Sequence, residues 1–201
     1  FIEEHAIGIL PLAVIFGANA SGKSNFFAAI QAAKDLVVSA RPRPEDTINI
    51  QSFRFARESS TLPTKFDFTI LVGKRIFRYQ FALTFSHVVE ESLHEIEGSS
   101  EQQIFSRKVG KGGEAEWNLK GLKKALATDQ FKFVEFKTQD TQRNHLFINA
   151  ARGKDIQAID EVANWFLNLA LISPNTVFKA AETSLDASDG LRDYCNRALD
   201  S

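Results

Sequence analysis

The spacing of apolar residues changes along the chain, and each change predicts a different kind of element. Residues 12–16 form a short continuous apolar run, which is typical of a buried strand. From residue 24 to about residue 40 apolar side chains recur at three- and four-residue steps, which predicts a helix that Pro42 and Pro44 end. The predicted buried face of this helix consists of Phe26, Phe27, Ile30, Ala33, Leu36 and Val37.

Strict alternation of apolar and polar residues then replaces the helical period. Residues 66–72 and 77–85 alternate on either side of Gly73 and Lys74, which predicts an antiparallel hairpin with one buried face. The same behaviour extends to residues 48–55, 88–96, 103–109 and 115–119, with a second turn at Gly112-Gly113. The side chains that we expect to point into the core of this antiparallel sheet are Phe66, Phe68, Ile70, Val72, Phe77, Tyr79, Phe81, Leu83 and Phe85.

Helical spacing returns in the last third of the chain. Residues 119–127 indicate a helix, the apolar patch at 131–136 is of undecided type, and residues 144–151 are ambiguous. Residues 154–170 give the clearest amphipathic helix, and its apolar face consists of Ile156, Ile159, Val162, Ala163, Phe166 and Leu167. A polar segment at 182–199 also indicates a helix.

These patterns predict a mixed α/β (α+β) fold in three segments. Residues 1–47 carry a strand, a loop and a helix, residues 48–119 an antiparallel β-subdomain of the same lobe, and residues 120–201 a helical part.

The loop between the first apolar run and the first helix carries the most specific chemistry. Its residues Gly17-Ala18-Asn19-Ala20-Ser21-Gly22-Lys23-Ser24 have the spacing G-x-x-x-x-G-K-S of a phosphate-binding P-loop. The two glycines allow a tight turn and a close approach of the backbone, so that N–H groups and the helix N-terminus form an anion site. We expect Lys23 to reach the β- and γ-phosphates of a nucleoside triphosphate and the Ser24 hydroxyl to ligate Mg²⁺.

Composition limits the partners and the compartment. The net charge is −1, so no global field attracts nucleic acid, and contact with DNA would need a local patch. The single cysteine, Cys195, excludes an intrachain disulfide framework and predicts a cytoplasmic protein. No apolar run approaches the length of a membrane span, and no signal peptide is visible. Methionine is absent, even at the first position, so we expect residues to be missing at the N-terminus. Whether internal methionines are missing as well stays open.

Asn19, Ser21 and Asn25 add detail to the general P-loop pattern. With them, residues 17–25 resemble the RecF-like and chromosome-maintenance branch of ABC-class ATPases. Within that branch the chain is most similar to the AAA-labelled ATP-binding proteins of bacterial abortive-infection systems, which are RloA-like and related to OLD-type ATPases. In that group an antiparallel β-subdomain follows the P-loop helix, and residues 66–93 resemble it.

The resemblance implies a set of ligands and partners. It implies ATP and Mg²⁺ as cofactors and ATP hydrolysis in the full-length protein, in anti-phage defence or DNA metabolism. It also implies a homodimer through the ATPase lobe and an effector protein as a possible partner. The nucleotide contacts that it implies are Gly17, Ala18, Asn19, Ala20, Ser21, Gly22, Lys23, Ser24 and Asn25.

Two motifs of that class are missing. A Walker B strand consists of four apolar residues followed by Asp-Glu, and a signature loop acts from a partner subunit. The nearest acidic pair, Asp160-Glu161, follows apolar residues at helical steps, so we interpret it as one face of a helix. We therefore identify no catalytic residue, expect the catalytic half beyond Ser201, and expect this chain alone to bind ATP weakly and hydrolyse it negligibly. Gln139 and Gln142 are candidates for the Q-loop glutamine, although polar loop residues are usually solvated.

Other polar residues offer less. The histidines show no metal-ligand spacing and are interpreted as ordinary strand or loop residues: His5, His87, His94 and His145. The basic Arg41–Arg43 turn is a candidate contact for a phosphate or DNA, but solvated turn charges are commoner. Two alternatives stay open: a non-hydrolysing nucleotide-binding regulatory module, and another P-loop kinase or GTPase. The missing guanine signature disfavours a GTPase, and the long β-meander disfavours a compact kinase.

Overall fold

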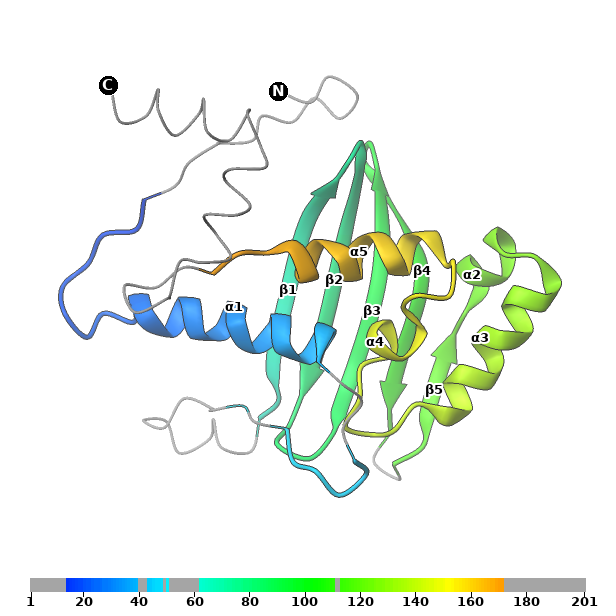
Figure 1. The fold of residues 1–201 in the computed structure, drawn as a ribbon, viewed down its shortest axis with the longest axis horizontal. Coiled ribbons are helices and arrows are strands. Elements are labelled where there is room, and N and C mark those ends of the chain that lie inside the picture. The colour runs from blue at the N-terminus through cyan, green and yellow to red at the C-terminus, as the bar shows by residue number, and fades with distance from the viewer. Residues whose placement is uncertain (1–13, 40–42, 49, 51–61, 111–112, 172–201) are drawn as a thin grey trace. The chain divides into compact units, whose positions relative to one another are not determined.

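The computed structural model describes residues 14–39, 43–48, 50, 62–110 and 113–171 (Figure 1). The chain divides into two compact units, Phe1–Leu169 and Ala170–Ser201, and every element below belongs to the first. Predictions for residues 1–13, 40–42, 51–55 and 182–199, with His5 and Cys195, fall outside the described residues.

A five-stranded antiparallel sheet forms the centre of the first unit. Its strands are β1 (Thr64–Val72), β2 (Arg75–Leu83), β3 (Val88–Glu97), β4 (Ser100–Val109) and β5 (Ala115–Asn118), and each pairs with the next in chain order. The meander predicted from alternation is confirmed. Ile48 and Ile50 are an exception, since neither is in a strand, and the Ile48 N–H instead donates to the Phe85 carbonyl at 2.7 Å.

Strand register places the apolar side chains on one face of the sheet. Phe68 lies opposite Tyr79, Tyr79 opposite Leu93, and Leu93 opposite Phe105, so these four side chains form one row across the strands. Phe68 and Tyr79 pack against Phe166, and Phe105 and Trp117 pack against Phe147. The predicted buried face is thus the one that the helices cover. Phe85 is a correction: β2 ends at Leu83, and Phe85 lies in the following turn with 67% of its surface exposed.

In the described residues five helices accompany the sheet: α1 (Lys23–Val38), α2 (Lys120–Ala125), α3 (Thr128–Asp140), α4 (Phe147–Ala151) and α5 (Gln157–Asn168). The undecided patch at 131–136 belongs to α3, and the ambiguous segment at 144–151 contains α4. Figure 1 shows α4 and α5 over one face of the sheet, with α1 alongside them. The predicted face of α5 is confirmed except at Leu167, which is 52% exposed.

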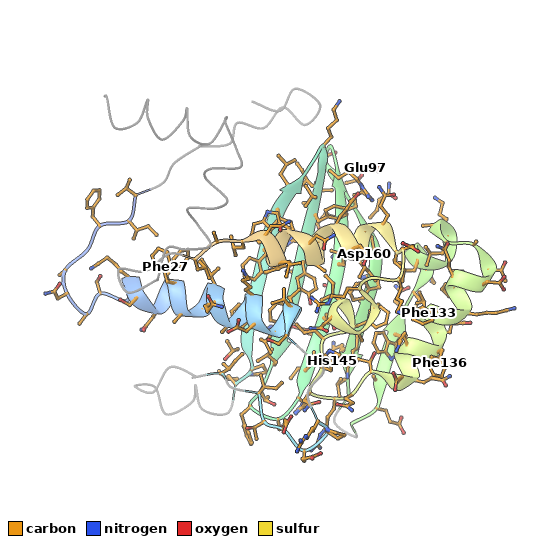
Figure 2. All side chains as sticks on the ribbon, in the orientation of Figure 1. Phe27, Glu97, Phe133, Phe136, His145 and Asp160 are labelled. Atoms are coloured by element: carbon orange, nitrogen blue, oxygen red, sulfur yellow. The ribbon has the colours of Figure 1, made fainter. Side chains whose placement is uncertain are left out.

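Among the described residues, the buried side chains of α1 lie in its second half. Ala33 and Val37 are buried, and the Lys34 ammonium donates to the Leu169 carbonyl at 2.6 Å. Phe26 and Phe27, predicted on the buried face, are each 52% exposed, and Figure 2 shows Phe27 near the N-terminal end of α1. The helical period of these two residues is correct, but the hydrogen bonds that join α1 to α4 and to Leu169 lie in its C-terminal half, at Lys34, Leu36 and Val37.

Candidate nucleotide-binding site

Both glycines of the loop before α1 have a structural reason. The Ser21 N–H donates to the Ala18 carbonyl at 3.2 Å, which closes a tight turn. A Cβ on Gly17 would lie 2.5 Å from the Ser21 hydroxyl oxygen, so no larger residue fits there without movement. Gly22 has φ 95°, a left-handed conformation that side chains other than glycine rarely adopt. The two glycines of the motif therefore serve different needs: Gly17 leaves room for the Ser21 side chain, and Gly22 allows the left-handed backbone.

The Lys23 side chain turns back over this loop. Its ammonium donates to the Gly17 carbonyl at 2.5 Å, to the Ala18 carbonyl at 2.7 Å and to the Ser21 hydroxyl at 3.2 Å. These three bonds hold a positive charge at the concave side of the loop. Four of the residues predicted to contact the nucleotide are thus brought together: Gly17, Ala18, Ser21 and Lys23. Residues 17–25 contain no carboxylate that would repel an anion.

The start of α1 leaves donors available. The helix begins at Lys23, as the motif predicts, and its first backbone bond runs from the Phe26 N–H to the Gly22 carbonyl at 3.1 Å. No side chain caps this end, and the first turn contains no acidic residue. The N–H groups of the first turn therefore lack intrahelical acceptors and face outward at the positive end of the helix dipole. Backbone donors, an ammonium and the exposed Ser24 hydroxyl are the groups that fit a phosphate with a bound magnesium ion.

Comparison with known families agrees with this geometry. A model of the family described as "AAA domain, putative AbiEii toxin, Type IV TA system" matches residues 12–123, which is more than half of the chain. The chain belongs to this AAA family. Its fold is therefore that of a P-loop NTPase, and membership of the family supports a P-loop ATPase-like domain. No curated protein and no solved structure matches this chain.

The segment that leads into the loop of this AAA domain differs from its prediction. Val14, Ile15 and Phe16 are not in a strand and are 62%, 55% and 89% exposed. The expected buried strand at 12–16 is wrong for these three residues, while residues 12 and 13 lie outside the described part. An apolar run becomes a buried strand only between hydrogen-bonded neighbours, and none of the described strands pairs with it.

The acidic pair Asp160-Glu161 lies in α5, as its helical spacing predicts. The Asp160 carboxylate accepts the Gly153 N–H at 2.5 Å, and the Glu161 carboxylate pairs with the Arg75 guanidinium at 2.7 Å. Arg75 also forms an ion pair with Glu95, and the pKa of Arg75 is raised, first by its hydrogen bond to Glu95 and then by charge attraction. Both carboxylates of the pair thus hold α5 to its preceding turn and to the sheet.

The two Q-loop candidates lie in the segment that leads to α4. Gln139 is exposed on α3, and the Gln142 carbonyl accepts from the Arg107 guanidinium at 3.4 Å. Asn149 of α4 donates to the Ser39 carbonyl at the C-terminal end of α1, at 2.9 Å. The loop at residues 17–24 precedes the N-terminal end of α1. At 1.5 Å per residue this 16-residue helix is about 24 Å long, so Asn149 lies about that far from the loop. A role of either glutamine at the nucleotide stays a prediction.

A buried carboxylate that the sequence analysis missed fixes α4 on the sheet. Glu91 of β3 is 1% exposed and accepts the Phe147 N–H at 2.7 Å, the Ile148 N–H at 3.0 Å and the Tyr79 hydroxyl at 3.0 Å. Arg107 lies directly opposite on β4, and its guanidinium donates to the His145 carbonyl at 3.0 Å.

Charge burial controls the titration of this cluster. Burial raises the pKa of Glu91, an effect that the two backbone N–H bonds and the Arg107 charge oppose. Burial lowers the pKa of Arg107, and burial together with the Glu91 charge raises that of the Tyr79 phenol. Because α4 in turn holds the C-terminal end of α1, this network fixes the helix that follows the candidate nucleotide-binding loop. Strand parity was the available signal, since Glu91 lies two residues before the inward-facing Leu93.

The described histidines have structural surroundings. His87 Nδ1 lies 3.0 Å from the Thr84 hydroxyl, His94 Nε2 lies 3.3 Å from the Gln103 amide, and His145 is buried. Over the described ranges, no three His, Cys, Asp or Glu side chains are grouped as a metal site. None of the described helices is long and apolar enough to cross a bilayer.

Proposed function

We propose that this AAA domain is the ATP-binding lobe of an ABC-type ATPase that hydrolyses ATP with Mg²⁺ in the full-length protein. The observation that supports it best is the loop itself, closed by the Lys23 ammonium at an uncapped helix start. The Asn19, Ser21 and Asn25 pattern supports the ABC branch. A role in anti-phage defence or DNA metabolism is supported by that resemblance and by the family description, which names a toxin of a toxin–antitoxin system.

Each part of the loop has a separate task in this proposal. In this proposal the Lys23 ammonium, which lies on the Gly17 and Ala18 carbonyls and the Ser21 hydroxyl, exchanges these acceptors for oxygens of the β- and γ-phosphates when nucleotide binds. The first-turn N–H groups of α1 bind phosphate oxygens, and the Ser24 hydroxyl is placed one residue further along to ligate the metal ion. When bound, Mg²⁺ neutralises charge on the phosphate oxygens.

Hydrolysis also needs a group that orients the attacking water. Residues 17–25 contain no carboxylate, and Asp160 and Glu161 have structural partners. We propose that the missing groups come from outside the described residues, in a homodimer with nucleotide between the subunits. The exposed apolar side chains around the loop support a protein-covered surface there: Val14, Ile15, Phe16, Phe26 and Phe27. An effector protein is a second candidate to cover it.

The alternative is a regulatory module that binds nucleotide without hydrolysing it. The absence of a carboxylate in the loop favours this alternative as much as it favours a dimer. A P-loop kinase or GTPase is less consistent with the five-stranded meander that separates α1 from the later helices. Steady-state phosphate release separates hydrolysis from binding alone.

The experiment has two parts. First, ATP·Mg²⁺ is titrated into the 201-residue chain and its Lys23→Ala variant, with the Gly22 amide signal in NMR as a local reporter. Loss of the charge-assisted bonds lowers affinity about tenfold or more in the variant, and equal affinities contradict the site. Second, phosphate release is measured for this chain and for the full-length protein. If the full-length protein hydrolyses ATP and Lys23→Ala abolishes this activity, the result supports the ATPase. If the full-length protein binds ATP without hydrolysing it, the result supports the regulatory module.

A further inference from the structure

Positive charge is concentrated in one part of this chain. Residues 120–154 contain eight Lys and Arg against three Asp and Glu, a net charge of +5. The whole chain has a net charge of −1, which leaves −6 on the remaining residues. A local asymmetry of this size is typical of a surface that contacts an anionic partner, although the overall charge conceals it.

Within this segment, three lysine ammonium groups lie near phenylalanine rings, and we call these residues and the neighbouring α2 lysines the Lys–Phe ridge. Lys123 Nζ lies 5.9 Å from the Phe131 ring centroid, and Lys154 Nζ lies 5.9 Å from that of Phe133. Lys137 Nζ lies 5.7 Å from the Phe133 centroid and 5.9 Å from the Phe136 centroid. The ridge comprises Lys120, Lys123, Lys124, Phe131, Phe133, Phe136, Lys137 and Lys154.

The ridge is accessible and only partly neutralised. Phe136 is 60% exposed, and Figure 2 shows Phe133 and Phe136 on α3, at the side of the molecule away from α1. Lys137 pairs with Asp140. By contrast, the lysines of α2 and Lys154 have no carboxylate within ion-pair distance among the described residues: Lys120, Lys123, Lys124 and Lys154. These four cations are free to contact phosphates.

We propose that the Lys–Phe ridge binds single-stranded nucleic acid. Proteins that bind single strands combine cations that follow the phosphate backbone with aromatic rings on which bases stack. The α2 lysines and Lys154 supply the cations, and the exposed Phe136 ring supplies a stacking surface. A duplex keeps its bases stacked on each other, so it would use the lysines but not the ring. This site is separate from the nucleotide-binding loop and does not depend on the proposed ATPase.

The test is fluorescence anisotropy with a labelled 20-nucleotide oligothymidine at several salt concentrations. Four phosphate contacts predict a slope of log K against log salt of about −2.8, at about 0.7 per contact. Replacing Lys123 and Lys124 together by Gln removes about 1.4 from the magnitude of this slope. Phe136→Ala weakens binding by about 5- to 150-fold, the range for one base stacked on an aromatic ring.

Matched controls test location as well as charge. The double variant Lys65→Gln/Lys108→Gln makes the same charge change on the sheet, and Phe85→Ala removes another exposed ring. Both should bind like the unaltered chain, and so should Lys23→Ala, which disables only the loop. A slope that changes equally in both lysine pairs overturns the proposed location. Undetectable binding of the oligonucleotide at about 50 mM salt overturns the proposal. The proposal is also overturned if an unlabelled duplex competes as strongly as an unlabelled single strand and Phe136→Ala has no effect.

Discussion

Truncation of Glu91 should be far more costly than a surface substitution, because four groups depend on its carboxylate. Glu91→Ala leaves the Phe147 N–H, the Ile148 N–H and the Tyr79 hydroxyl without their buried acceptor. It also leaves the Arg107 guanidinium, which is 3% exposed, without a neighbouring negative charge. A buried donor left without its acceptor costs about 1–3 kcal/mol, and the loss of the charge near Arg107 adds to this, so we expect a total loss of about 3–5 kcal/mol. That is a large fraction of a total stability of about 5–15 kcal/mol.

Urea unfolding followed by circular dichroism measures this loss directly, provided that different probes give coincident transitions. The matched control is Glu90→Ala, the neighbouring residue whose carboxylate is 44% exposed and pairs with Lys65 across the surface. That substitution should change stability by less than about 1 kcal/mol. If Glu91→Ala costs no more than Glu90→Ala, the argument that this network holds α4 to the sheet is refuted.

The same carboxylate predicts how stability depends on pH. Burial raises the pKa of Glu91 above its ordinary 4.5, so the folded protein keeps a proton that the unfolded chain has released. This contribution to stability is fully present below pH 4.5 and is lost as the pH rises through the higher folded pKa. Glu91→Gln removes the titration, so the stability difference between the two proteins should change across that window. A constant difference from pH 4 to about pH 8 would contradict the direction of the shift.

Three further substitutions test separate parts of the structure. Gly17→Ala places a Cβ against the Ser21 hydroxyl, so nucleotide affinity in an NMR titration should fall while the melting temperature stays within about 2 °C. Phe166→Ala empties the contact with the sheet aromatics and should cost about 3–5 kcal/mol in urea unfolding, and a loss below about 1 kcal/mol would contradict its burial. Gly121→Ala drives a Cβ into the backbone carbonyl of Gln103 and should displace α2, which amide chemical shifts along β4 would report. Unchanged shifts there would mean that α2 does not approach the strand so closely.

Local patterns determine the elements whose signals lie within a few consecutive residues. The loop depends on Gly17 and Gly22 at fixed spacing, and both the turn and the helix start at Lys23 follow from it. The sheet follows from alternation, because a period of two is incompatible with a helix over nine or ten residues. The helical period around Asp160 and Glu161 was sufficient to place that pair in α5 instead of a buried strand.

Contacts between distant segments decided the rest. Residues 14–16 and the first turn of α1 have the composition of buried elements, but the sheet and helices described here do not reach them. Burial depends on what a segment packs against, and periodicity within the segment carries no information about that. Glu91 is the opposite case, because it is a polar residue in a strand and yet is buried. Its partners are Tyr79 and Arg107 on the two neighbouring strands and the start of α4, which lies 56 residues further along the chain. Whether a charge is solvated or becomes the centre of a network is set by its partners, and those partners are adjacent only after the chain has folded.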